Sequence, residues 1–382
     1  MHILIIPSWY SGNLDDVNGS FFREQAIALR KSDYKVGVIA PIFRSMRDVK
    51  GLFTKGCGTK YQNDAGVDTY RYHTINIPKL RGFERFRWTN IGLSLYKKYV
   101  KNHGVPDLVH VHSMINGGFL AYEIKKKFNV PYVITEHSTA FARGLVRQKL
   151  DKKIKEICQQ ASSLTCVSTP FKKLLENRYG FKFSVLFNIV DKLFFEHPIS
   201  IRDENTFTFI NVAFMDEKKN QALLIETFAK QFKNTNKKLV LIGNGALENT
   251  LKELTVKLEI NKQVFFLGRL SREEVCAEML KADCFVLTSN YETFGVVLIE
   301  ALASGLPLIA TKCGGPEDIV NSSNGILIDV NNQMQLESAM IQMVNNYKLY
   351  DKEKLRTEAQ DRFGEKVFVD NALSFYKKGI IK

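Results

Sequence analysis

The chain has 382 residues, of which 45% are hydrophobic and 25% charged, as in an ordinary globular protein with room for two full cores. Its formal net charge of +14 is uneven: residues 1–200 hold 31 Lys and Arg against 16 Asp and Glu, and residues 201–382 hold 23 against 24. The longest apolar region, 294–310, is interrupted by Glu300, two glycines and Pro307, which excludes a membrane span there.

The first half alternates short apolar runs with helical patterns. Strands are expected at Ile3–Ile6, Lys35–Ala40, Asp107–His112, Tyr132–Thr135 and Ser163–Val167. Helices are expected at Gly19–Arg30 and Gly117–Phe128. This alternation predicts a parallel sheet covered by helices. The polar stretch 196–205 lacks periodicity and reads as a linker.

The second half repeats the alternation. Strands are expected at Thr206–Val212, Lys238–Ile242, Gln263–Leu267, Asp283–Thr288, Leu306–Ala310 and Gly325–Ile328. Helices are expected at Gln221–Phe232, Leu247–Leu258, Glu273–Lys281, Leu336–Asn345 and Lys366–Lys378, and another after Gly295. We therefore predict an α/β protein of two Rossmann-like domains, 1–200 and 201–365, that face each other across a cleft, with the last helix, 366–382, packing back on the first domain.

The cysteines and the first seven residues give information about the cellular compartment of the protein. Six cysteines are scattered without a C-x-x-C motif, which is typical of reduced core residues in a cytoplasmic protein. The start, residues 1–7, lacks a basic segment before its short apolar run and favours a first strand over a signal peptide. No Asp-x-Asp motif and no His/Cys cluster with ligand spacing occurs, so we expect neither a metal nor another cofactor.

Two carboxylates lie eight residues apart at Glu292 and Glu300. The pattern places Glu292 in a strand-to-helix loop and Glu300 on the helix that follows Gly295. A helix N-terminus beyond a parallel strand suits a phosphate, and ionised carboxylates suit the hydroxyls of a sugar. Together they predict a site for a nucleotide sugar. Taken alone, the spacing is weak, because carboxylates eight apart are common on solvated helices.

Several ordered motifs resemble the donor domain of retaining GT-B glycosyltransferases of group 1, glycosyltransferase family 4. They are VAFMDEKKN (212–220), IGNG (242–245), FLGRL (266–270), ETFGVVLIEALASGLP (292–307) and GGPEDI (314–319). The resemblance implies that Glu292 contacts the donor sugar and Glu300 the ribose hydroxyls. It also implies that Lys219 neutralises the diphosphate. The family places an arginine five residues before that lysine, where this chain has Phe214; Lys218 or Arg269 could substitute.

The resemblance implies further donor contacts. The backbone of Thr293, Phe294 and Gly295 would meet the phosphates and the sugar. Gly243 and Gly245 would line the donor site, although plain turn chemistry explains them as well. Arg269 and Leu270 would lie where the backbone reads the base.

The first half matches the family less closely. Residues 8–10 and 17–25 resemble its first strand, loop and helix, in which Gly19 lets the backbone face the diphosphate. His137, in the run 135–138, resembles the histidine beside the reacting sugar, and His112 also ends a strand; either could instead be structural. The segment 188–191 resembles the crossing between the domains.

We therefore expect transfer of a hexose-type sugar from a nucleotide diphosphate sugar, UDP before GDP, to a hydroxyl acceptor with retention of configuration. The acceptor would be a saccharide or lipid-linked, in polysaccharide, capsule or lipopolysaccharide synthesis. Two alternatives remain: a sugar-nucleotide epimerase of the same fold, and, remotely, a basic nucleic-acid-binding protein, for which no RRM, KH, zinc-finger or basic-zipper signature occurs.

Basic and aromatic residues interleave at 79–88, in the basic half of the chain. Such a segment could lie against anionic lipid at the inner face of the cytoplasmic membrane. It could equally be the solvated face of a helix.

Overall fold

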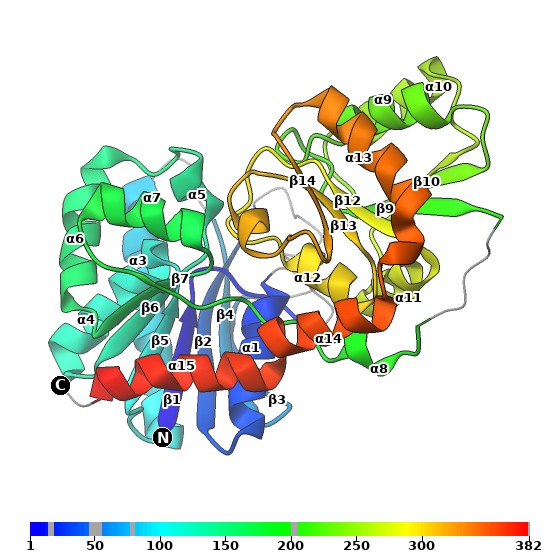
Figure 1. The fold of residues 1–382 in the computed structure, drawn as a ribbon. Helices are drawn as coiled ribbons and strands as arrows, with labels where there is room; N and C mark the ends of the chain where they lie inside the picture. The colour runs from blue at the N-terminus through cyan, green and yellow to red at the C-terminus, as the bar shows by residue number, and fades with distance from the viewer. Residues whose placement is uncertain (14–18, 46–55, 77–80, 200–204, 381–382) are drawn as a thin grey trace. The chain divides into compact units, whose positions relative to one another are not determined.

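The computed structural model describes residues 1–13, 19–45, 56–76, 81–199 and 205–380 (Figure 1). The chain divides into two compact units. The first contains Met1–Val167, Lys172–Asn188 and the chain from Lys366 on. The second contains Ser168–Phe171 and Ile189–Glu365. The predicted linker at 196–205 falls partly outside the described residues, and the units divide between Asn188 and Ile189.

The first unit is built on a sheet with the strand order β3-β4-β2-β1-β5-β6-β7-β8. These strands are β1 (His2–Pro7), β2 (Lys35–Arg44), β3 (Gly58–Asp64), β4 (Val67–Ile75), β5 (Leu108–His112), β6 (Tyr132–Glu136), β7 (Ser163–Cys166) and β8 (Ser184–Val185). Every residue of β1 is buried, and β1 pairs in parallel with β2 and β5. Because the connections run in opposite directions from this central strand, the switch point of the sheet lies between β1 and β5, and open α/β sheets bind ligands beyond the carboxyl ends of such strands.

Most helices of the first unit connect these strands, whereas α15 follows the second unit along the chain (Figure 1). They are α1 (Ser20–Lys31), α3 (Arg81–His103), α4 (Phe119–Phe128), α5 (Thr139–Ala142), α6 (Asp151–Gln160), α7 (Thr169–Tyr179) and α15 (Glu365–Ile380), with short turns at Met114–Gly118 and Gln148–Leu150. The last helix, α15, packs on this unit: the Tyr376 hydroxyl lies 2.7 Å from Nδ1 of His110.

The antiparallel pair β3 and β4 was not predicted. The strand β3 is mostly polar and half exposed, so it carries no hydrophobic run. Its link to β4 is a two-residue turn in which Ala65 and Gly66 both have positive φ, 49° and 85°. That backbone matches the twist of a tight hairpin, but Ala-Gly is a weaker turn signal than Asn-Gly.

The second unit has an all-parallel sheet in the order β11-β10-β9-β12-β13-β14. Its strands are β9 (Phe207–Val212), β10 (Lys237–Ile242), β11 (Val264–Gly268), β12 (Cys284–Leu287), β13 (Leu308–Thr311) and β14 (Gly325–Ile328). This is the Rossmann order, with its switch point between β9 and β12. Both units therefore confirm the predicted fold class of two Rossmann-like α/β domains.

Helices and a phenylalanine-rich core complete the second unit. The helices are α8 (Leu193–Glu196), α9 (Gln221–Phe232), α10 (Glu248–Lys257), α11 (Arg272–Lys281), α12 (Val296–Ala303), α13 (Gln333–Asn346) and α14 (Lys352–Phe363), with short turns at Gly315–Asp318 and Tyr347–Leu349. In the core, Phe209 packs against Phe228 and Phe232, with ring centroids 6.4 and 5.5 Å away. Across the described residues, every helix is too short or too polar to traverse a lipid bilayer.

Candidate active site

Three loops of the second unit are locked together at the carboxyl ends of its strands. The Ala213 N–H donates to the Ile242 carbonyl at 2.9 Å, and the Gly243 N–H donates to the Gly268 carbonyl at 2.8 Å. Gly243 has a φ of 129°, and a Cβ there would lie 2.0 Å from the Ala213 carbonyl oxygen. A Cβ on Gly245 would lie 2.2 Å from the Met215 carbonyl oxygen. Close backbone packing therefore requires both glycines, and their contact with a donor stays a prediction.

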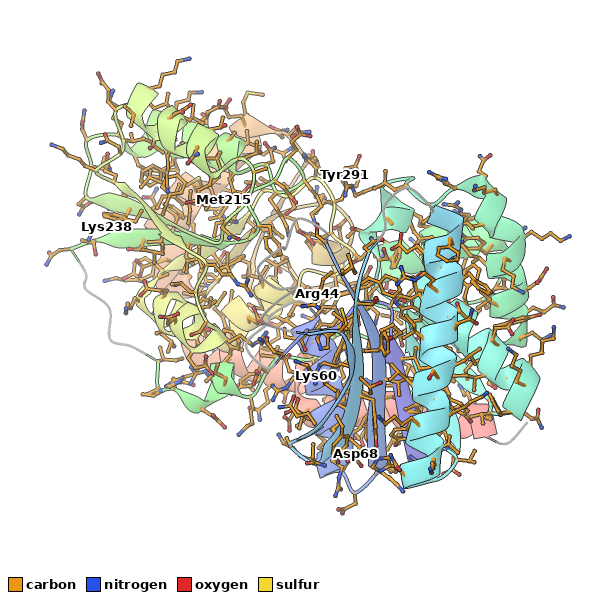
Figure 2. The ribbon with its side chains drawn as sticks, turned by 180° about the vertical axis from the view of Figure 1, so that it is seen from behind. Arg44, Lys60, Asp68, Met215, Lys238 and Tyr291 are labelled. Atoms are coloured by element: carbon orange, nitrogen blue, oxygen red, sulfur yellow. The ribbon has the colours of Figure 1, made fainter. Side chains whose placement is uncertain are left out.

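The loops after β9 and β12 meet at the switch point of this sheet. The Thr288 hydroxyl donates to the Lys219 and Asn220 carbonyls at 3.1 and 3.0 Å. The Asn290 N–H donates to the Lys218 carbonyl at 2.7 Å. Tyr291, labelled in Figure 2, belongs to the same loop and is 44% exposed. Hydrogen bonds from one loop thus fix the backbone that carries the two lysines.

Glu292 forms a nearly buried ion pair with Lys219. Lys219 Nζ lies 2.5 Å from Glu292 Oε1, and the two side chains are only 12% and 9% exposed. The Ser289 hydroxyl donates to the same oxygen at 2.9 Å. Burial alone would raise the pKa of Glu292, but the positive charges of Lys219 and Lys218 outweigh it, so the pKa lies below its ordinary value. The carboxylate is therefore ionised at neutral pH.

Phe214 occupies the position at which the family has an arginine, and its side chain is 62% exposed. Lys218, suggested as a substitute, acts on the Glu292 carboxylate electrostatically. Arg269, the other suggestion, is exposed after β11, next to the half-buried Leu270. Both suggestions stay predictions.

The turn into α12 presents backbone rather than side chains. Phe294 is 2% exposed, and its ring packs edge-on against Phe363 with centroids 5.9 Å apart. Thr293 is also buried. Gly295, with a φ of 101°, lets the chain turn into the first residue of α12, Val296. The positive end of the helix dipole at this turn suits a phosphate group.

Glu300 is buried on α12 and pairs with an arginine that sequence reasoning did not single out. Arg272 Nη2 donates to Glu300 Oε1 at 2.9 Å, and Arg272 Nε lies 3.4 Å from Asp191 Oδ2. Burial raises the pKa of Glu300 and Asp191 raises it further, whereas Arg272 opposes both. The only local signal at Arg272 is the capping box of Ser271 and Glu274, which starts α11 there.

In the first unit, the neighbouring ends of β5 and β6 bring two histidines together. His112 Nδ1 lies 3.0 Å from His137 Nε2, and both rings are buried. Burial lowers the pKa of each well below its ordinary value, so both are neutral and one ring donates its N–H to the other. Phe22 meets the His137 ring edge-on, with centroids 4.9 Å apart. Gly19 starts α1 with a φ of 75°.

Glu136 is a buried carboxylate in the same region that the sequence did not single out. It accepts backbone hydrogen bonds from Met114, His137 and Ser138 at 2.6, 2.9 and 2.7 Å. Burial raises its pKa although these hydrogen bonds oppose the rise. Because it ties the loop after β5 to the loop after β6, Glu136 fixes the backbone on which the two histidines sit.

The basic and aromatic segment starts α3, although Lys79 and Leu80 lie outside the described residues. Phe83 and Phe86 are exposed at 47% and 62%, and their ring centroids are 6.5 Å apart. Trp88 is buried. The segment therefore presents two aromatic side chains on its surface and uses the third in the core.

Comparisons with known proteins agree with this architecture. Residues 19–192 match the model described as Glycosyltransferase Family 4, and residues 194–362 match the model described as Glycosyl transferases group 1. The chain is 25% identical to N-acetyl-alpha-D-glucosaminyl L-malate synthase of Bacillus anthracis over 80% of this chain and 83% of that protein. It is 25% identical to the putative teichuronic acid biosynthesis glycosyltransferase TuaC of Bacillus subtilis over 89% and 88%.

Among solved structures, Anabaena HepE in complex with UDP superposes with a TM-score of 0.74 at 18% identity, over 99% of this chain and 100% of that one. At that identity the likeness concerns the fold. The two family models together span nearly the whole chain, one on each unit, and each of the two relatives is aligned over most of its length. The chain is therefore an enzyme that belongs to the group 1, family 4 glycosyltransferases of the GT-B fold.

Proposed function

We propose that the chain transfers a hexose-type sugar from a nucleotide diphosphate sugar to a hydroxyl acceptor with retention of anomeric configuration. The observation that carries the proposal is the buried ion pair of Glu292 and Lys219 at the β9–β12 switch point, beside the N-terminus of α12. An ionised carboxylate there accepts hydrogen bonds from sugar hydroxyls. The lysine and the helix end supply positive charge for the diphosphate.

In the proposed reaction, the bond from the anomeric carbon to the β-phosphate oxygen breaks, and a bond to the acceptor oxygen forms on the same face. The acceptor proton passes to an oxygen of the leaving phosphate. Negative charge grows on the diphosphate, and Lys219 with the turn at Thr293, Phe294 and Gly295 would stabilise it. This arrangement supports metal-independent transfer, which is expected to persist in EDTA.

His137 would lie beside the reacting sugar, and the ribose hydroxyls would bind Glu300. Gly19, Gly243 and Gly245 would bring backbone close to the donor, and the backbone at Arg269 and Leu270 would meet the base. A neutral His137 supports this assignment, because a neutral imidazole can accept a hydrogen bond from a hydroxyl as well as donate one.

UDP is the proposed nucleotide ahead of GDP, supported by a structural neighbour that was solved with UDP. A saccharide or lipid-linked acceptor of cell-surface polysaccharide synthesis is supported by the relative in teichuronic acid biosynthesis. A thermal-shift panel of UDP, GDP, ADP and CDP, followed by their sugars, tests the donor. Stabilisation by none of them would contradict the proposal.

Two variants test the site itself. Glu292→Gln and Glu300→Gln should each abolish transfer while the circular dichroism spectrum stays that of the wild type. Wild-type turnover in both variants would contradict the assignment. Product analysis with the donor alone separates transfer from epimerisation, since an epimerase converts the donor without an acceptor.

We also propose a peripheral contact between the start of α3 and anionic membrane, supported by the exposed ring pair of Phe83 and Phe86 and the basic excess of residues 1–200. Flotation with vesicles that contain anionic lipid should recover the chain, and vesicles of neutral lipid should recover less. Replacing both phenylalanines by serine should weaken the recovery, whereas Leu349→Ser, at an 81% exposed site in the second unit, should not. Equal recovery with both kinds of vesicle would refute this contact.

A further inference from the structure

Arg272 is held between two carboxylates and an aromatic ring, all in the second unit. Its guanidinium donates to Glu300 at 2.9 Å, approaches Asp191 at 3.4 Å and lies over the Phe194 ring, 5.5 Å from its centroid. Its side chain is 21% exposed, and Glu300 is 7% exposed at its own side chain. A planar guanidinium braced on several sides has little freedom to move.

We infer that Arg272 is a positioning residue of the donor site, which keeps Glu300 ionised and directs one carboxylate oxygen to the two neighbouring hydroxyls of a nucleoside ribose. This inference rests on the proposed function, in which Glu300 is the group that binds the ribose. Among the described residues, Arg272 is the one hydrogen-bond donor to this carboxylate, and it bonds to Oε1. Oε2 is the oxygen left to accept from the ligand.

The surroundings of Glu300 explain why it needs such a partner. Burial favours the neutral carboxyl, and the negative charge of Asp191 acts in the same direction. The Cys276 thiol on α11 also interacts electrostatically with Glu300, and Arg356 on α14, which donates to the Ala303 carbonyl of α12, acts on that thiol. Within the part of the chain that the structure describes, Arg272 alone donates to the carboxylate, so its removal shifts Glu300 towards the protonated form, which is a poorer acceptor.

The contacts of Arg272 indicate that it orients Glu300 and does not block the ribose from binding to it. Asp191 and Phe194 hold the guanidinium independently of Glu300, so a ribose that binds Oε2 need not displace it. Lysine cannot reproduce this role in full, because an ammonium is a point charge that lacks the planar fork of donors. If Arg272 were instead a competitor of the ribose, its removal would tighten nucleotide binding.

The test is calorimetric titration of the full chain with UDP and with 2′-deoxy-UDP at pH 6 and pH 8. Wild type should prefer UDP at both values. In Arg272→Met the pKa of Glu300 rises further, because the cation that opposes burial is gone, so affinity for UDP should fall severalfold at pH 6 and less at pH 8. The preference for UDP over the deoxy analogue should shrink at pH 6. The affinity of Arg272→Lys for UDP should lie between those of the wild type and Arg272→Met.

Lys281→Met is the matched control, because it removes a cation from the same helix. Among the described residues, Lys281 is 66% exposed at its side chain and pairs only with Glu278. This control should bind UDP and 2′-deoxy-UDP with wild-type affinity at both pH values. An Arg272→Met protein with wild-type affinity at both pH values, or with tighter affinity, overturns the inference. Should that variant fail to fold by circular dichroism, Arg272→Lys decides: an affinity ratio between pH 6 and pH 8 equal to that of wild type also overturns it.

The two proposals fail differently. Wild type that binds none of UDP, GDP, ADP and CDP would overturn the proposed function together with the inference. Wild type that binds a nucleotide, with variants whose pH dependence is unchanged, would overturn the role of Arg272 alone. If wild type selects GDP, the same titrations are made with GDP and its 2′-deoxy analogue.

Discussion

Replacing Lys219 by methionine should destabilise the chain in a way that depends on Glu292. The variant leaves a carboxylate that is 9% exposed without its nearest cation. Removing one partner of a buried ion pair costs about 3–5 kcal/mol. Because Ser289 still donates to Glu292 and Lys218 still contributes charge, we expect a loss somewhat below that range, roughly 2–4 kcal/mol.

The pH dependence follows from the lowered pKa of Glu292 in the wild type. A lowered pKa contributes stability that is present above the ordinary value, near 4.3, and is lost as the pH falls through the folded value. In Lys219→Met, only Lys218 and Ser289 oppose the effect of burial on Glu292, so the pKa of Glu292 rises. The free-energy difference between the two proteins should therefore be larger at pH 8 than at pH 5.

The assay is a double-mutant cycle by calorimetric unfolding of the full chain. A loss of roughly 2–4 kcal/mol corresponds to a Tm decrease of about 4–16 °C for a unit of this size. Lys219→Met and Glu292→Gln together should cost less than the sum of the single variants by about 1–3 kcal/mol. Lys281→Met, in an exposed pair, should leave Tm nearly unchanged. Additive single-variant effects would refute the coupling.

Three further outcomes are expected from the full chain. Gly243→Ala should lower the free energy of unfolding by more than about 3 kcal/mol or prevent folding, because its Cβ would lie 2.0 Å from the Ala213 carbonyl oxygen. The control is Gly104→Ala, which has a positive φ but no atom within 4 Å of the new Cβ, and it should lose about 1 kcal/mol in thermal unfolding. Tyr376→Phe should cost about 1–2 kcal/mol, since it leaves the buried His110 without that partner; an unchanged Tm would contradict the contact of α15. His110, His112 and His137 are buried in the first unit and have lowered pKa values, that of His110 to about 3. The unfolded chain therefore takes up protons at these side chains first as the pH falls below about 6.5. Stability against urea should therefore decrease from pH 7.5 to pH 5.5 by up to about 1.4 kcal/mol per histidine, and a flat profile would contradict their burial as neutral rings.

Local patterns predicted much of the fold and part of the site. The parallel strands of both units follow from their apolar runs, and the loop and helix around Glu292 and Glu300 follow from Gly295 and the apolar stretch beyond it. The strand β3 escaped prediction because its residues are mostly polar. Its stability comes from pairing with β4, which no local window contains.

Partners far apart in sequence were the main omission. Lys219 and Glu292 were each singled out, but nothing in the sequence paired them across 73 positions. Arg272 follows an ordinary helix start, and only the folded chain shows that it reaches Glu300 and Asp191. The close approach of Gly243 and Gly245 to the loop after β9 is likewise a property of the sheet order, which places β10 beside β9.

The second unit is inserted into the first, since the chain enters it at Ile189 and leaves it at Glu365, apart from the short piece Ser168–Phe171. The two crossing segments are tied together where the Val190 N–H donates to the Phe363 carbonyl at 2.9 Å. On a ribosome, the helix that delivers Tyr376 to His110 emerges 266 positions after its partner. The sheet of the first unit must therefore wait until α15 has been translated, while the inserted second unit can already fold, so synthesis favours completing the second unit first.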